Sequence, residues 1–80
     1  MRKLAAGNWK MNGTAASLAE VAALIAAQPD PSCEMLLCPP ATLISAMAQA
    51  ARGSGLQVGA QDCHPKASGA HTGDLSAPML

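Results

Sequence analysis

The stretch Gly7-Asn8-Trp9-Lys10-Met11-Asn12-Gly13 places a cation and two amide side chains directly after a short apolar run. That run, Lys3 to Ala6, predicts a strand, and the closing glycine predicts a turn that leads into a helix. In parallel α/β proteins, binding groups gather on the loops that follow the carboxyl ends of the strands. We therefore expect Asn8 and Lys10 to face a pocket, and Trp9 to point the other way and pack between strand and helix.

A first helix is predicted over about Thr14 to Ala27, because apolar residues recur there at helical spacing and two prolines follow. The residue that caps this helix is open at this stage. Ser17 has Glu20 at capping-box spacing, but Asn12 and Thr14 suit the position equally well.

The next segments alternate between strand and helix. The continuous apolar run Glu34–Cys38 predicts a strand buried on both faces, and Pro39-Pro40 opens a second helix that glycines end. Leu56–Ala60 predicts a third, weaker strand. The order strand, helix, strand, helix, strand predicts an α/β fold with parallel strands and right-handed crossovers. Two helices cannot cover both faces of such a sheet.

The end of the chain has a different pattern. From Gln61 to about Ala77 there is no periodicity, and structureless loops of this length are usually functional or disordered. Pro78–Leu80 is expected to open a third helix. We find no internal repeat and no low-complexity linker.

Length and charge limit the possible functions. Eighty residues form one domain at most, and half of them are hydrophobic but include one Trp and no Phe or Tyr. A formal net charge of zero argues against nucleic acid or an anionic membrane as partner. We read no secretory signal and no membrane-spanning stretch, so we expect a cytoplasmic protein. Three cysteines without a CxxC pair are expected to be free thiols.

Several candidate residues also have ordinary structural explanations. A single lysine such as Lys10 is more often a solvated surface group, and the stretch around it fits neither GxxxxGK[ST] nor GxGxxG, which disfavours a nucleotide loop. The pair Gln61-Asp62 is more often turn chemistry. Cys63-His64 and the distant His71 lack ligand spacing and an acidic orienting partner, so no metal site is expected.

Three motifs in order carry a resemblance to a known family. The stretch Gly7 to Gly13, then Gly59-Ala60-Gln61-Asp62-Cys63, then Gly69-Ala70-His71-Thr72-Gly73-Asp74 resemble the first strand end, the third strand and the long following loop of triose-phosphate isomerases. The match covers nearly all of the chain but only about a third of a (β/α)8 barrel of roughly 250 residues. The resemblance implies that residues 1–80 are the N-terminal βαβαβ part of one incomplete TIM barrel domain.

The same resemblance implies a function. It implies an isomerase of glycolysis and gluconeogenesis that interconverts dihydroxyacetone phosphate and glyceraldehyde 3-phosphate through an enediolate, as a cytoplasmic homodimer without cofactor or metal. Lys10 matches a catalytic, substrate-binding lysine, and Asn8 a substrate-binding asparagine. Gln61 matches a glutamine just behind the site. Thr72, Gly73 and Asp74 match the loop that reaches into the partner subunit.

The sequence departs from the family pattern in three places. Asp62 stands where an asparagine is common, His71 where an aromatic residue is usual, and Asp74 where a glutamate is usual. The resemblance also implies that the family's base, electrophile and lid would lie beyond Leu80, so we expect the isolated chain to be inactive. Two other readings stay open: a fragment that self-associates through strand edges without chemistry, and an unrelated phosphate-binding module.

Overall fold

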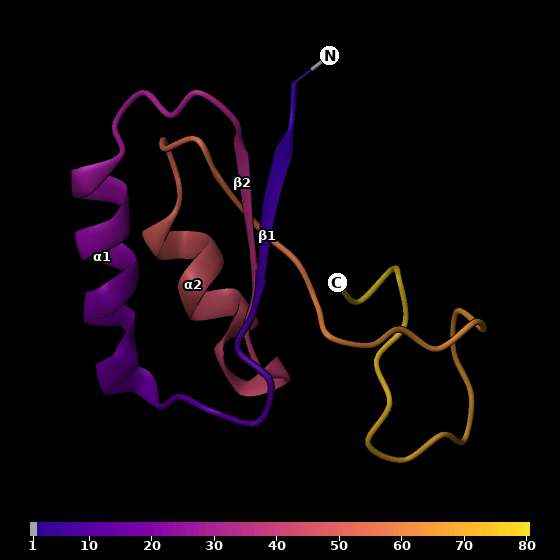
Figure 1. Ribbon diagram of the computed structural model, residues 1–80. Helices are drawn as coiled ribbons and strands as arrows, with labels where there is room; N and C mark the ends of the chain where they lie inside the picture. Colours follow the sequence, from indigo (N-terminus) through magenta and orange to yellow (C-terminus); the bar gives the residue numbers. More distant parts are fainter. Residues whose placement is uncertain (1) are drawn as a thin grey trace.

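The computed structural model describes residues 2–80 and contains a three-stranded parallel sheet in the order β1-β2-β3 (Figure 1). Each connection between neighbouring strands carries a short 3-10 turn followed by an α-helix. The βαβαβ order and the α/β class predicted from the sequence are confirmed. The elements are β1 (Leu4–Asn8), α1 (Leu18–Ala27), β2 (Glu34–Cys38), α2 (Ile44–Ala50) and β3 (Leu56–Val58).

Both helices lie on the same side of the sheet, and Figure 1 shows α1 and α2 together beside β1 and β2. The core between them consists of Val21, Met47, Ala51 and Leu56, all almost fully buried. Side chains alternate along β2, so that Met35 and Leu37 pack against this core while Leu36 and Cys38 point to the opposite face.

The expectation that β2 is buried on both faces is wrong for this chain. Its first residue is exposed and its other four are only half-buried. The reason is that the helices cover one face of the sheet, and no other helix or strand in the described part of the chain packs on the second face. Parallel sheets ordinarily have both faces covered.

The first strand is longer than predicted. It runs to Asn8 rather than Ala6, because β2 pairs with it residue by residue as far as the partners Asn8 and Cys38. The amide of Trp9 continues the pairing by donating to the carbonyl of Cys38 at 3.0 Å. This extension fixes the start of the Lys10 loop on the sheet.

The first helical segment starts where the sequence left three choices. Thr14 is the N-cap, and the Ser17 hydroxyl accepts a hydrogen bond from the Thr14 amide at 3.0 Å. Ala15–Ser17 form a 3-10 turn before α1 begins at Leu18. The predicted end at Ala27 is confirmed.

The second half of the sheet follows the predicted pattern with shorter elements. Ala41–Leu43 form a 3-10 turn after the two prolines, and α2 then buries Met47 completely. Gly53, with a φ of 79°, lies in the turn that follows α2. The strand β3 ends at Val58 rather than Ala60, although the Gly59 amide still donates to the Leu37 carbonyl at 2.9 Å.

The segment 61–77 contains neither helix nor named strand, as predicted, but it is closed at its base. The His64 amide donates to the Leu75 carbonyl at 2.8 Å, and His64 forms an isolated bridge with Ser76. The third helix expected at Pro78–Leu80 is not formed. Only a single turn is present, because one turn fixes several residues for few hydrogen bonds and does not persist as a helix. Among residues 2–80, no helix has the length and apolar character that a bilayer span requires.

Candidate active site

Lys10 lies just beyond the carboxyl end of β1, on an exposed loop with an unusual backbone conformation. Its φ is 57°, and it is the only non-glycine residue with positive φ in residues 2–80. The Oδ1 atom of Asn8 accepts a hydrogen bond from the Lys10 amide at 2.7 Å. Asn side chains stabilise turns in this way, by bonding the backbone two residues further on. The conformation costs free energy, and such residues cluster at functional sites.

Gln61 ties this loop to the rest of the sheet. Its Nε2 atom donates to the Lys10 carbonyl at 2.9 Å and to the Cys38 carbonyl at 3.0 Å. One amide group from the end of β3 thereby joins the residues that follow β1 and end β2. The geometry gives Gln61 a positioning contact with the backbone of Lys10.

The Lys10 ammonium is available for an anion. Lys10 is exposed, and no carboxylate in residues 2–80 forms an ion pair with it. The Asn8 side chain, which uses its oxygen on the Lys10 amide, lies next to it. A cation fixed at the mouth of a sheet can attract a phosphate and stabilise negative charge that develops during a reaction.

Trp9 lies on the opposite side from its two neighbours, as predicted. It is half-buried and packs against the core cluster. Its ring lies so close to Gly13 that a Cβ at Gly13 would come within 2.9 Å of it. The Trp9 carbonyl also accepts a hydrogen bond from the Asn12 side chain at 2.9 Å. Trp9 thus anchors the loop while Lys10 projects from it.

Asp62 stays close to its own backbone. Its Oδ1 atom accepts a hydrogen bond from the Cys63 amide at 2.8 Å. It forms no ion pair with a cation in the described residues, and the Cys63 thiol contacts only the His64 carbonyl, at 3.6 Å. Asp62 therefore acts as a turn residue in this chain and does not neutralise Lys10.

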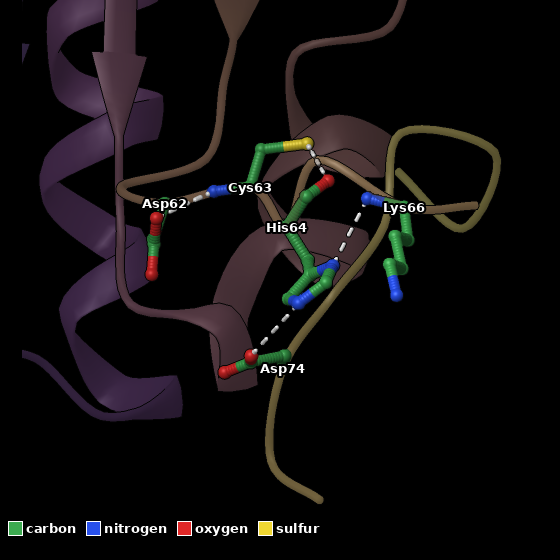
Figure 2. Close-up of polar contacts among 5 residues, drawn as sticks. All are labelled: Asp62, Cys63, His64, Lys66 and Asp74. Carbon is green, nitrogen blue, oxygen red and sulfur yellow. Dashed lines mark hydrogen bonds and ion pairs between the residues drawn. The ribbon is translucent and has the colours of Figure 1, made fainter. Parts of the chain in front are cut away.

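The long loop brings together side chains that are distant in sequence, as Figure 2 shows. The Nε2 atom of His64 lies 3.9 Å from the Oδ2 atom of Asp74, and the Lys66 amide donates to the Nδ1 atom of His64 at 3.0 Å. The His71 ring stacks on the His64 ring with centroids 3.9 Å apart. The sequence analysis found no acidic partner for these histidines, and the structure supplies Asp74.

The loop residues Thr72 and Gly73 lie at an exposed tip. The Asp74 amide donates to the His71 carbonyl at 3.0 Å, which closes a turn around them. This tip makes no contact with Lys10 through any hydrogen bond in residues 2–80. The chain therefore brings Asn8, Lys10 and Gln61 together, and holds Thr72, Gly73 and Asp74 on a separate projection.

Comparison with known proteins decides what this arrangement belongs to. The family model for triosephosphate isomerase matches residues 3–80. A triosephosphate isomerase of Dinoroseobacter shibae is 63% identical over 79 residues, one of Bradyrhizobium diazoefficiens 61% over 82, and one of Jannaschia sp. 65% over 79. The chain belongs to the triosephosphate isomerase family.

The alignments cover 99 to 100% of this chain and 32 to 33% of each of these three triosephosphate isomerases. The chain thus spans about a third of the length of the curated relatives it matches. Its parallel three-stranded sheet with two helices is the N-terminal βαβαβ part of the triosephosphate isomerase barrel. The uncovered face of the sheet is consistent with that partial length.

Sequence reasoning missed two features of the site. The bond from the Lys10 amide to Asn8 requires the positive φ of Lys10, and the sequence carries no signal for that conformation at a lysine. The contact between His64 and Asp74 depends on how the loop closes on itself, which no short-range pattern records. The family motif pointed to Gln61, but not to the two carbonyls that it joins.

Proposed function

We propose that this chain is the N-terminal part of a triosephosphate isomerase domain, an enzyme that interconverts dihydroxyacetone phosphate and glyceraldehyde 3-phosphate through an enediolate. Family membership supports this activity, and the observation that carries it is the exposed Lys10, held at the end of β1 by Asn8 and Gln61. A fixed cation suits a doubly charged phosphate ester and the negative charge of an enediolate.

Each site residue has a distinct part in this proposal. Lys10 binds the substrate and stabilises the developing charge, and Asn8 lines the pocket and holds the Lys10 backbone. Gln61 does not touch substrate. It positions Lys10 by bonding its carbonyl group. The reaction needs no cofactor in this proposal, because proton transfer between neighbouring carbons requires only a base and electrostatic stabilisation.

The exposed tip supports a second part of the proposal. Thr72, Gly73 and Asp74 project away from the sheet and form part of a homodimer interface, with Thr72 approaching the partner's site. We place the enzyme in the cytoplasm. The three cysteines are free, which suits a reducing compartment.

The isolated 80-residue chain is expected to be inactive, because residues 2–80 offer no carboxylate or imidazole bonded to Lys10 or Asn8 that could move a proton. A chimera in which residues 1–80 replace the matching third of the Dinoroseobacter shibae relative is expected to isomerise both triose phosphates. Coupled steady-state assays of both proteins check this. Activity of the isolated chain, or an inactive but folded and dimeric chimera, would contradict the proposal.

The uncovered sheet face favours one alternative for the isolated chain. β1 and β3 are both edge strands, and Leu4 on β1 is 53% exposed. Exposed edges promote pairing with other chains, so the fragment could self-associate without chemistry. Light scattering after size exclusion separates the two behaviours, because a single monodisperse species at 8.0 kDa would rule out association of the fragment.

A further inference from the structure

The loop between β3 and the C-terminus contains two imidazoles and a carboxylate that converge outside the proposed active site. One nitrogen from each of His64 and His71 and one oxygen of Asp74 lie within 4.8 Å of one another. His64 is held at the closed base of the loop, where its amide bonds Leu75. The base of the loop thus fixes one of the three groups, while His71 and Asp74 lie near the exposed tip.

We propose that His64, His71 and Asp74 bind a divalent transition-metal ion of the zinc class. Two imidazoles and one carboxylate are ligands that zinc, nickel and copper accept, whereas calcium and magnesium prefer oxygen ligands. Water would complete a four-coordinate ion. This site is independent of the proposed isomerase activity, since no hydrogen bond or ion pair in residues 2–80 joins it to Lys10.

The separation of His64 from Asp74 supports an ion between them. Their facing atoms are 3.9 Å apart, which is too long for a hydrogen bond. Two ligands that each lie about 2.0 to 2.2 Å from a zinc ion are separated by roughly this distance. A small inward shift of Asp74, whose side chain is 51% exposed, would reach ideal geometry.

An independent observation comes from Ser76. It is 4% exposed, and its hydroxyl oxygen has no hydrogen-bond partner within residues 2–80. Ser76 lines a cavity of about 50 Å³ together with His64, His71 and Asp74. Buried polar groups normally have a partner, and a space of this size holds a metal-bound water but not an organic ligand. A water on the ion would supply the missing partner.

One contact opposes metal binding and gives the proposal a specific signature. Because the Nδ1 atom of His64 accepts the Lys66 amide, the neutral ring carries its proton on Nε2, the atom that faces Asp74. A metal at Nε2 moves that proton to Nδ1 and breaks the bond to Lys66, which lowers the affinity about fivefold. Figure 2 shows the Lys66 side chain pointing away from Asp74, so its charge does not occupy the space between the ligands.

The test is calorimetric titration of the 80-residue chain with zinc chloride. The exposed Cys63 is replaced first, as Cys63→Ser, because a thiol beside His64 could bind zinc by itself. One zinc ion is expected to bind per chain. His71→Asn and Asp74→Asn are each expected to weaken binding at least tenfold, whereas the matched control Asp62→Asn is expected to leave it within twofold.

A second readout separates this site from unspecific histidine binding. In ¹H–¹⁵N spectra, zinc is expected to shift the Lys66 amide, because its acceptor is lost. Absence of binding, equal weakening by Asp74→Asn and Asp62→Asn, or a zinc affinity unchanged in 6 M urea would each overturn the proposal.

Discussion

Gly13 is the residue where the packing of the Lys10 loop leaves least room. Its φ is 108°, and a Cβ would meet the Trp9 ring at 2.9 Å and the Leu43 side chain at 3.2 Å. Positive φ costs an L-residue about 1 to 2 kcal/mol. A clash in a packed region adds about 1 to 3 kcal/mol. Both terms apply at Gly13.

Gly13→Ala is therefore expected to lower the free energy of unfolding by about 3 kcal/mol. Gly53→Ala is the matched control, because Gly53 has a φ of 79° but nothing within 4 Å of a Cβ, so only the backbone term of about 1 kcal/mol applies. Urea unfolding of the chimera measures both. Equal losses at the two glycines would show that contact with Trp9 does not constrain the loop.

At the residue scale, the sequence predicted identities better than conformations. It predicted that Trp9 packs inward while Lys10 projects, because side chains alternate at the end of a strand. It did not predict that Lys10 has positive φ, because that conformation is stabilised by Asn8 and by Gln61 from another strand. The contact between Gln61 and Lys10 spans 51 residues, and local patterns do not record such pairs.

Helix α2 shows how an element gains its place from one buried side chain. Met47 is 0% exposed and lies between α1 and the sheet with Val21 and Leu56 as neighbours in the core cluster. The chain has few large core residues, since it contains one Trp and no Phe or Tyr. Much of the attachment of α2 therefore depends on Met47.

Met47→Ala is expected to cost about 2 to 5 kcal/mol, because it removes buried methylene groups and leaves a cavity. Gln49→Ala, on the exposed face of the same helix, is expected to cost less than about 0.5 kcal/mol. Urea unfolding of the chimera compares the two. A loss at Met47 as small as that at Gln49 would mean that α2 does not pack as described.

At the element scale, periodicity predicted every strand and helix but not their ends. β2 matches its predicted bounds because apolar residues fill it completely. β1 and β3 differ by two residues at one end, since pairing with a neighbouring strand decides where each stops. The predicted third helix failed because the helical pattern had only three residues to support it.

The whole molecule is a sheet with one covered face. The helices bury one side of β1, β2 and β3, and the other side carries the half-buried Leu36 and Cys38. Composition indicated this outcome, because two helices cannot cover both faces of a parallel sheet. The family match accounts for it, since the chain spans about a third of the length of its curated relatives.

The central claim is that the loop after β1 presents Lys10 to the substrate. Its most direct test is kcat/KM of the chimera with Lys10→Met, compared with the matched control Lys3→Met at the opposite end of the same strand. Removal of a preorganised electrostatic group typically costs about 10² to 10³ in rate. We expect a loss of at least that size for Lys10→Met and a change within about twofold for Lys3→Met. Equal activity of the two variants would contradict the account.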